Sequence, residues 1–205
     1  MLKSLFDGVM ERRAHQLIEQ VRDWLPNEGR ILDLGSGTGH MSAQLEREPG
    51  IEVINADVSD MHVVGRPPIL IADGALPFDD NSHAAVLLFF MLGYPENPAA
   101  VLREAARVTR GPVILVQSLY AGRLGYAWHR AREFVWTIVA FHASKATGYV
   151  PKQAMFSMNT RRFYTDATLQ REFALAGLRV SARRNRSVAP GGMLVVASVR
   201  LERDE

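Results

Sequence analysis

The 205-residue sequence predicts an α/β domain with a seven-stranded, mostly parallel sheet, helices on both faces and an antiparallel final strand. Three observations predict this class. Helical and strand periodicities alternate along the chain. An unbroken apolar run over 84–90 is typical of a strand buried on both faces at the centre of a parallel sheet. Gly35, Gly37 and Gly39 follow the first predicted strand and open a helix.

Apolar spacing and chain-breaking residues place the elements of the first half. Ala14, Leu17, Ile18 and Val21 recur at helical intervals before Pro26. Short apolar runs bounded by glycine, proline or aspartate indicate the strands. In order, we expect a helix over about 9–24, a strand over 30–34, a helix over 38–47, and strands over 51–56, 68–72 and 84–90.

The second half continues the alternation to residue 117 and then changes character. A helix over 98–107 and a strand over 112–117 precede a segment of mixed helix and loop over 118–162. Thr165 is a favourable N-cap and Gly177 a favourable C-terminal stop for a further helix. Strands over 178–184 and 193–201, joined by residues 189–192, are expected as an antiparallel hairpin at one edge of the sheet.

Length and composition favour a single domain over 1–205. Hydrophobic residues make up 47% of the chain and charged residues 22%, as in ordinary globular proteins. There is no cysteine, which excludes disulfides, thiolate nucleophiles and cysteine-ligated metal sites. No spacing of histidines and carboxylates indicates another metal site. No signal peptide is visible and no apolar run approaches the ~20 residues of a membrane span, so the expected localisation is cytoplasmic.

The pattern Asp33-Leu-Gly35-Ser-Gly37-Thr-Gly39 is the sharpest local signal for a ligand. Glycines allow a tight turn and close approach of the backbone, and the following helix offers free N–H groups. Dinucleotide sites use G-x-G-x-x-G, but here the third glycine comes one residue early and His40 follows it. A phosphate-binding P-loop lysine is also missing. The loop suits a ligand without a pyrophosphate; a turn without any ligand is the alternative.

Acids also stand at the ends of the next two predicted strands. Asp57, about 20 residues after the glycine loop, is placed to accept hydrogen bonds from ribose hydroxyls. Asp73 is placed to accept from an adenine amine, or simply forms an Asp-Gly turn with Gly74. Because ligands of open α/β sheets bind outside the carboxyl ends of the strands, these positions are expected to converge on one crevice.

Over about 30–117, and less closely over 164–200, the chain resembles the class I S-adenosylmethionine-dependent methyltransferases. The resemblance is to their quinone-biosynthesis methyltransferase-like group (methyltransferase type 11). Residues 31–39 resemble the first family motif, 53–59 the ribose motif, 72–82 the adenine-side motif, and 102–108 the helix before the fifth strand. This resemblance implies a Rossmann-like fold and methyltransferase activity. It also implies S-adenosylmethionine as the cofactor and S-adenosylhomocysteine as the product.

The resemblance implies that Asp33 and the glycine loop face the methionine portion of the cofactor. The expected cofactor-binding residues are Asp33, Gly35, Ser36, Gly37, Gly39, Asp57, Val58, Asp73, Gly74 and Phe89. Many family members carry histidines after the fourth strand, where this chain has Met91-Leu-Gly-Tyr94. No catalytic residue can therefore be assigned from the resemblance.

The segment 118–162 differs from the rest in charge and aromatic content. It holds seven basic residues, one acid and eight of the chain's 17 aromatic residues. We expect it to cap the substrate, with Tyr94, Tyr126, Trp128 and His129 as candidate pocket residues. Three interpretations stay open: a helix packed on the sheet with a solvated basic face, a cover for a large hydrophobic acceptor, or peripheral membrane contact. The cluster at 183–186 is too short to indicate nucleic acid.

The sequence thus predicts methyl transfer to a small, hydrophobic or aromatic acceptor. The alternative is a non-catalytic S-adenosylmethionine-binding or regulatory module of the same fold. A nicotinamide-dependent oxidoreductase is disfavoured by His40. The acceptor, the atom that is methylated and the oligomeric state are left open, because function depends on the site rather than on the fold.

Overall fold

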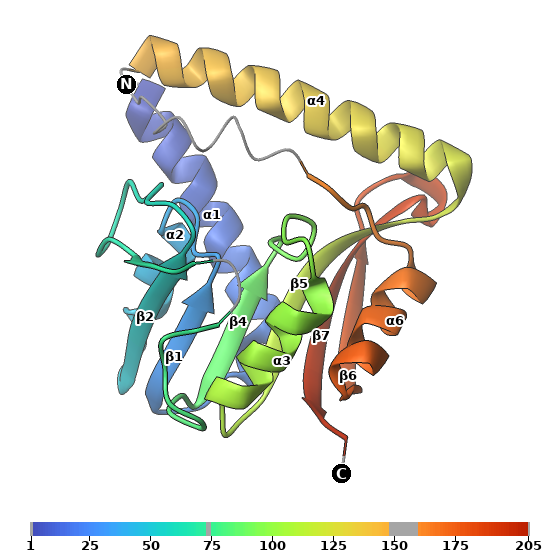
Figure 1. The fold of residues 1–205 in the computed structure, drawn as a ribbon. Coiled ribbons are helices and arrows are strands. Elements are labelled where there is room, and N and C mark those ends of the chain that lie inside the picture. The colour runs from blue at the N-terminus through green and yellow to red at the C-terminus, as the bar shows by residue number, and fades with distance from the viewer. Residues whose placement is uncertain (1, 73–74, 148–159, 205) are drawn as a thin grey trace.

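The computed structural model describes residues 2–72, 75–147 and 160–204. Its strands form one sheet in the order β3-β2-β1-β4-β5-β7-β6 (Figure 1). The strands are β1 (Gly29–Leu34), β2 (Ile51–Asp57), β3 (Ile69–Leu70), β4 (Ala85–Phe89), β5 (Val113–Tyr120), β6 (Leu178–Ser187) and β7 (Leu194–Arg203). Among the described strands, the final strand β7 pairs antiparallel with both β5 and β6, as predicted, and the other pairings are parallel.

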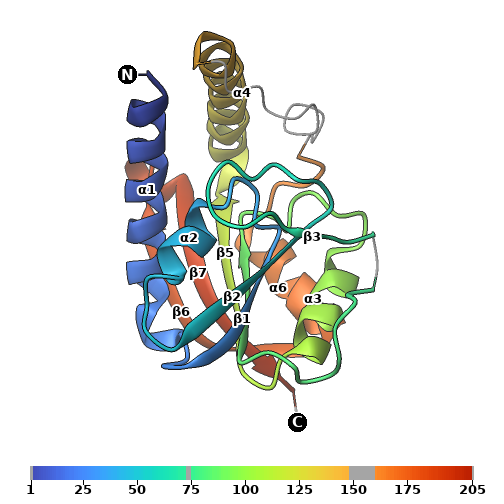
Figure 2. The ribbon, with the colours of Figure 1, turned by 90° about the vertical axis from the view of Figure 1, so that its left-hand side faces the viewer.

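Helices cover both faces of the sheet. They are α1 (Leu2–Val21), η1 (Arg22–Trp24), α2 (His40–Leu45), α3 (Pro98–Val108), α4 (Gly122–Thr147), α6 (Asp166–Ala176) and η2 (Pro190–Gly192). Figure 2 shows α1 and α2 on one side of the sheet, with α3 and α6 on the other. The long helix α4 crosses the end of the molecule at which β5 finishes (Figure 1). In the described part of the chain, no helix is long and apolar enough to cross a membrane.

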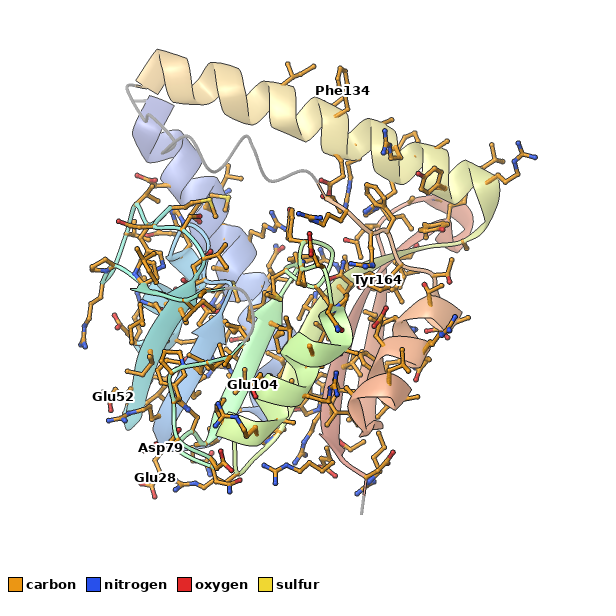
Figure 3. All side chains as sticks on the ribbon, viewed as in Figure 1. Glu28, Glu52, Asp79, Glu104, Phe134 and Tyr164 are labelled. Atoms are coloured by element: carbon orange, nitrogen blue, oxygen red, sulfur yellow. The ribbon has the colours of Figure 1, made fainter. Side chains whose placement is uncertain are left out.

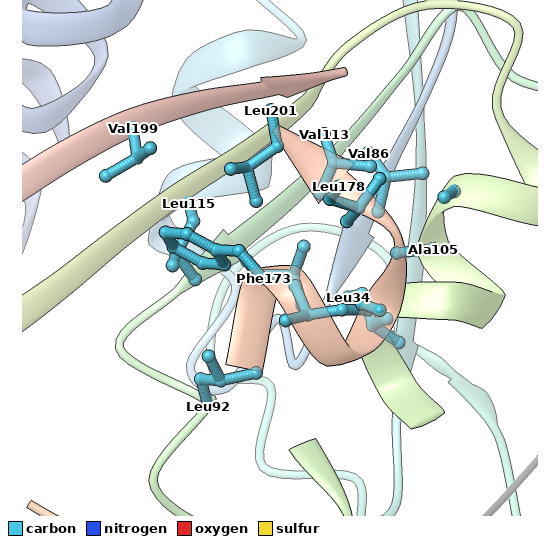
Figure 4. Packing of buried hydrophobic residues seen from close by; sticks show 14 of the residues in the cluster. Leu34, Val86, Leu92, Ala105, Val113, Leu115, Phe173, Leu178, Val199 and Leu201 are labelled. Atoms are coloured by element: carbon cyan, nitrogen blue, oxygen red, sulfur yellow. The ribbon is translucent and has the colours of Figure 1, made fainter. Parts of the chain in front are cut away.

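Two hydrophobic clusters hold these layers together, and β4 contributes to both. Val86 and Leu88 belong to the cluster under α3 and α6, which includes Phe173 (Figure 4). Ala85, Leu87 and Phe89 belong to the cluster under α1. Successive residues of a strand point to opposite faces, so a strand covered on both sides must be apolar throughout. This confirms the interpretation of the apolar run over 84–90.

The strand order creates a crevice between β1 and β4. These two strands pair in parallel, while the chain leaves β1 toward β2 on one side and reaches β5 on the other. Loops that leave the two strands therefore diverge, which is the place where open α/β sheets bind ligands.

Several element boundaries differ from the sequence prediction, for local physical reasons. The predicted strand over 68–72 pairs at Ile69 and Leu70; it does not begin at Pro68, because proline has no N–H to donate to the ladder. The helix expected from residue 38 starts at His40, since Gly39 is a left-handed N-cap with φ of 82°. By contrast, β5 extends to Tyr120 because β7 pairs with it there. The first helix begins earlier than expected, at Leu2, and ends in a 3₁₀ turn.

The segment 118–162 is more regular than predicted in its first part. Residues 122–147 form a single helix, α4, rather than mixed helix and loop; residues 148–159 lie outside the described part. Ala131, Phe134 and Ile138 of this helix are exposed. These three side chains therefore do not pack on the sheet.

Candidate functional site

A pocket of about 990 Å³ opens at the carboxyl ends of β1, β2, β4 and β5. One side is formed by the end of β1, the glycine loop and the end of β2. The opposite side is formed by α1, α4, the end of β5 and residues 160–163. The pocket thus lies at the crevice that the strand order creates, with α4 on the side away from the sheet (Figure 1).

The glycine loop requires glycine at its ends for steric reasons. At Gly35, φ is +77° and an added Cβ would lie 2.8 Å from the Cβ of Met91. At Gly39, φ is +82° and an added Cβ would lie 2.4 Å from the carbonyl oxygen of Val64. Gly37, by contrast, lines the pocket, and an added Cβ there would meet only the Gly35 carbonyl oxygen at 4.0 Å. The loop is therefore packed at its ends and open to a ligand at its middle.

Asp57 ties the end of β2 to this loop. Its side chain is 5% exposed and lines the pocket. The N–H of Gly37 donates to Asp57 Oδ2 at 2.9 Å, and the N–H of Ser59 donates to Oδ1 at 3.3 Å. A carboxylate has about four acceptor sites, so two such donors leave capacity for the hydroxyls of a ribose.

Asp33 is a buried carboxyl group on the floor of the pocket. Its side chain is 1% exposed and accepts a 2.6 Å hydrogen bond from the hydroxyl of Ser42 on α2. Burial raises the pKa of Asp33 to about 6; the Ser42 hydrogen bond opposes this and the nearby charge of Asp57 adds to it. At neutral pH the group is mainly an anion in a low-dielectric site, which favours a cationic ligand group.

The loop after β2 packs against the glycine loop, a contact that the sequence did not indicate. Ser36 Oγ lies 2.8 Å from His62 Nε2, and the N–H of Val63 donates to the Thr38 carbonyl at 3.2 Å. These contacts place Met61 in the pocket lining beside Val58, which is 52% exposed. The apolar side chains at this end suit a flat ring rather than a phosphate.

Arginine side chains line the opposite side of the pocket together with apolar ones. Arg13 on α1 lies over the ring of Phe90, with its guanidinium carbon 4.8 Å from the ring centroid. Phe90 has a φ of +56°, a backbone strain that is found mainly at functional sites. Arg132 on α4 donates to the hydroxyl of Ser118 at the end of β5, at 3.3 Å. With Glu133 also in the lining, this side has more basic than acidic side chains, while Asp33 and Asp57 make the other side negative.

Two buried polar side chains on the same side have atoms without a hydrogen-bond partner among the described residues. Gln117 is 7% exposed and its Oε1 is unpaired; His129 is 4% exposed and its Nδ1 is unpaired. The His129 ring packs edge-on against Phe163, with 4.7 Å between centroids. Burial, with a smaller effect from Arg132, lowers the pKa of His129 to about 4. His129 is therefore neutral at physiological pH and has one nitrogen to offer a ligand.

The chain that returns from α4 is fastened to the loop after β4. The N–H groups of Arg161 and Arg162 both donate to the carbonyl of Gly93, at 2.9 and 3.0 Å. The hydroxyl of Tyr164, which Figure 3 labels, donates to the carbonyl of Leu92 at 3.1 Å. A Cβ at Gly93 would lie 2.9 Å from the Arg162 carbonyl oxygen, so the two segments are in close contact.

The pocket brings most of the predicted site residues together. Those in its lining are Asp33, Gly35, Ser36, Gly37, Asp57, Val58, Phe89, Tyr94 and His129. Gly39 lies beneath the loop rather than in the lining. The predicted pocket residues Tyr126 and Trp128 are not in the lining: Tyr126 packs against Tyr120 and Phe163, and Trp128 is 53% exposed on the outside of α4. Asp73 and Gly74 lie outside the described residues. Within the described chain, no cluster of three or more histidine or acidic side chains is placed to hold a metal.

Sequence reasoning missed other members of the site. Gln117 and Ser118 lie near the carboxyl end of a central strand, where open α/β sheets bind ligands, so the sequence could have indicated them. Arg13 and Arg132 come from two helices whose position over the pocket has no local sequence signal. Met91 was noted only as a departure from a family motif, yet it packs against Gly35.

Comparison with known proteins gives a consistent picture. A family model described as a methyltransferase domain matches residues 6–182. An uncharacterized methyltransferase of Mycobacterium bovis is 32% identical over 135 residues, covering 62% of this chain and 51% of that protein. The demethylmenaquinone methyltransferase of Renibacterium salmoninarum is 37% identical over 106 residues, covering 48% of this chain and 44% of the relative. The chain thus spans about half the length of these curated relatives.

A solved structure supports the fold at lower identity. The geranyl diphosphate C-methyltransferase from Streptomyces coelicolor, in complex with Mg²⁺, geranyl diphosphate and S-adenosyl-L-homocysteine, superimposes with a TM-score of 0.62. It is 16% identical, and the match covers 94% of this chain and 81% of that chain. At this identity the likeness concerns the fold.

Proposed function

This chain belongs to the methyltransferase domain family, and on that premise we propose that it transfers a methyl group from S-adenosylmethionine to a small, hydrophobic acceptor. The observation that carries the proposal is the convergence of Asp33, the glycine loop and Asp57 on one side of a single pocket. The opposite side of that pocket has different chemistry and room for a second molecule. Donor and acceptor would therefore meet in one enclosed space.

The residues present fit the donor. S-adenosylmethionine is a cation with an ammonium group, a ribose and an adenine, and it supplies a methyl group that its sulfonium has already activated. Asp33 is placed to bind the ammonium group and Asp57 the ribose hydroxyls. Val58, Met61 and Ile71 offer apolar contacts to a flat ring. Gly37 leaves the open space that close approach of a ligand to the backbone requires.

The protein's remaining tasks are to orient the acceptor and exclude water. Met10, Leu17, Phe90 and Phe163 line the acceptor side and favour an apolar molecule. Gln117 and His129 have unpaired buried atoms there, so a polar group of the acceptor would relieve the cost of leaving them unpaired. These features support an acceptor that is mainly hydrophobic but carries a hydroxyl or a similar hydrogen-bonding group.

We assign His129 the role of a positioning residue rather than a strong base. A pKa of about 4 keeps it neutral, able to accept or donate one hydrogen bond but a poor acceptor of a full proton at pH 7. The described parts of the segment 118–162, which are residues 118–147 and 160–162, form the substrate cap in this proposal, since Arg132, Glu133, Thr160 and Arg161 line the pocket from them. Peripheral membrane contact through 118–162 is a separate proposal, because it concerns the outer face of α4 rather than the pocket.

The test has two stages. Calorimetric titration with S-adenosylmethionine and S-adenosylhomocysteine, with NADH as the control, should give micromolar binding of the first two only. Labelled methyl transfer is then measured on a panel of acceptors. Demethylated quinols and prenyl diphosphates come first, since relatives with these substrates share the family or the fold. In the His129→Gln variant, turnover should fall while the donor affinity stays unchanged.

Each stage can contradict the proposal. A folded wild-type protein that binds neither donor nor product would refute it. Donor binding without turnover on any member of a broad panel would instead favour a non-catalytic binding or regulatory module. If the donor affinity of His129→Gln falls as much as its turnover, then His129 does not act by positioning the acceptor.

A further inference from the structure

The outer face of α4 carries a continuous apolar stripe that the rest of the described structure leaves exposed. Leu124, Trp128, Val135 and Ile138 are 76%, 53%, 57% and 41% exposed. With Ala131, their spacing of four, three, four and three residues places them on one side of the helix. Phe134, beside the stripe, is 68% exposed and points away from the body of the molecule (Figure 3).

Among the side chains that the structure describes, the inner face of the same helix is mainly polar. His129, Arg132 and Glu133 line the pocket. Gly125 lies so close to the hairpin before β7 that a Cβ there would be 2.4 Å from the Met193 carbonyl oxygen. A surface helix of a globular protein normally turns its apolar face inward. In α4 the polarity is reversed, so its outer face is expected to have an apolar environment of its own.

Charge distinguishes the candidates for that environment. The sequence of α4 contains four basic residues and one acid, Glu133, which lies on the inner face. Arg123, which is exposed, lies near one margin of the stripe beside Phe134, whereas the guanidinium of Arg130 lies over the ring of Phe163. A second copy docking through the same face would place arginines of both copies beside an α4 surface that has no acid to pair with them. A surface with apolar material beneath negative charges matches both properties.

We propose that the outer face of α4 binds in the interfacial region of an anionic lipid bilayer. The helix would lie parallel to the membrane, with Leu124, Trp128 and Val135 at the level of the acyl chains. Arg123 would then lie near the lipid phosphates. The pocket, lined by the opposite face of this helix, would be close to the membrane surface. This proposal does not depend on which reaction the pocket performs.

Vesicle flotation tests the proposal directly. Wild-type protein should float with vesicles of phosphatidylcholine and phosphatidylglycerol in equal parts, and at least about tenfold less with phosphatidylcholine alone. Added salt should weaken the binding, because attraction between exposed charges is screened. Fluorescence of Trp128 should be quenched by brominated lipids, and the Trp128→Phe variant should lose that quenching.

Matched variants separate the stripe from general surface effects. The double variant Leu124→Gln with Val135→Gln should lose at least about tenfold in vesicle affinity, since both apolar anchors are removed. Leu175→Gln is the control, because Leu175 is also an exposed helical leucine, 59% exposed on α6. Arg123→Gln should weaken binding to the anionic vesicles several-fold, whereas Arg171→Gln on α6 should not.

Three results would overturn the proposal. The first is that wild-type protein does not float with either type of vesicle. The second is a double variant that floats as well as wild type. The third is a wild-type dimer, detected by light scattering, that Leu124→Gln converts to monomer, because the stripe would then be an interface between copies. Circular dichroism and S-adenosylmethionine affinity of each variant check that the fold is intact, so loss of vesicle binding is distinguished from failure of the proposed activity.

Discussion

The backbone N–H of Gly37 donates a 2.9 Å hydrogen bond to Oδ2 of Asp57, which joins the loop after β1 to the end of β2. The carboxylate therefore orients the loop before any ligand binds. Because the bond uses only part of the acceptor capacity of Asp57, one side chain can both shape the loop and contact a ligand.

This dual role predicts the effect of changing Asp57. In Asp57→Ala the affinity for S-adenosylmethionine should fall at least about tenfold, or 1.4 kcal/mol, since ribose and loop contacts are both lost. Asp57→Asn keeps one acceptor oxygen and should lie between wild type and Asp57→Ala. Calorimetric titration measures both. Equal affinity in all three proteins would exclude Asp57 from the donor site.

Replacing either of two glycines with similar φ by alanine is expected to lower the free energy of unfolding by different amounts. Gly39→Ala would place a Cβ 2.4 Å from a backbone oxygen that cannot move aside, so the free energy of unfolding should fall by about 3 kcal/mol or more. Gly177→Ala is the control: φ is +69°, but nothing lies within 4 Å of an added Cβ. Its cost should be only about 1 kcal/mol, from the backbone conformation alone. Urea denaturation gives both values, and equal costs would show that the contact with Val64 is unimportant.

Asp33 predicts a specific pH dependence of stability. Its folded pKa of about 6 exceeds the ordinary value of 3.8, so the folded protein holds a proton that the unfolded chain has lost between these pH values. The contribution of Asp33 to the free energy of unfolding is therefore greatest below about pH 4. It is lost as the pH rises through 6, by up to about 3 kcal/mol.

The Asp33→Asn variant isolates this contribution. Urea denaturation gives the free energy of unfolding of wild type and variant at about pH 4.5 and about pH 7.5. Relative to wild type, the variant should be more stable at the higher pH than at the lower one. A difference that does not change with pH would mean that Asp33 titrates normally in the folded protein.

Removing the hydroxyl of Tyr164 is expected to lower the free energy of unfolding, because a backbone carbonyl loses its donor. Tyr164 is 2% exposed, and its hydroxyl donates to the Leu92 carbonyl at 3.1 Å. The Tyr164→Phe variant therefore leaves that buried oxygen without this donor. The free energy of unfolding should fall by about 1–3 kcal/mol. Tyr126→Phe removes a hydroxyl from a side chain that is 40% exposed and should cost at most about 0.5 kcal/mol. Thermal or urea denaturation compares the two, and equal costs would contradict a structural role for the Tyr164 hydrogen bond.

The sequence predicted the central architecture well because the signals for it are local. The apolar run over 84–90, the caps at Thr165 and Gly177, and the glycine loop each depend on neighbouring residues, and the structure has the corresponding elements in place. The predictions were weaker where an element depends on a partner. The end of β5 at Tyr120 is set by its pairing with β7, which no short window of sequence contains.

The candidate site divides in the same way. Asp33, the glycine loop and Asp57 could be found from sequence, because strand ends and loop residues lie at fixed distances along the chain. The contacts of Arg13 with Phe90 and of Arg132 with Ser118 could not, since each joins residues from elements that are distant in sequence. The environment of His129 was also hidden, because burial depends on what packs around a residue rather than on its neighbours in the chain.

The sequence by itself thus determined the order of strands and helices along the chain, the glycine loop and the acids beside it, through periodicity, glycine conformation and strand-end position. The tertiary structure decided which helices enclose the pocket and which face of α4 is turned toward it. Periodicity can show that a helix has an apolar stripe, but not whether that stripe is buried. In α4 the polar face lies on the pocket and the apolar stripe is outside, and only the packing of α4 across the end of the sheet determines this orientation.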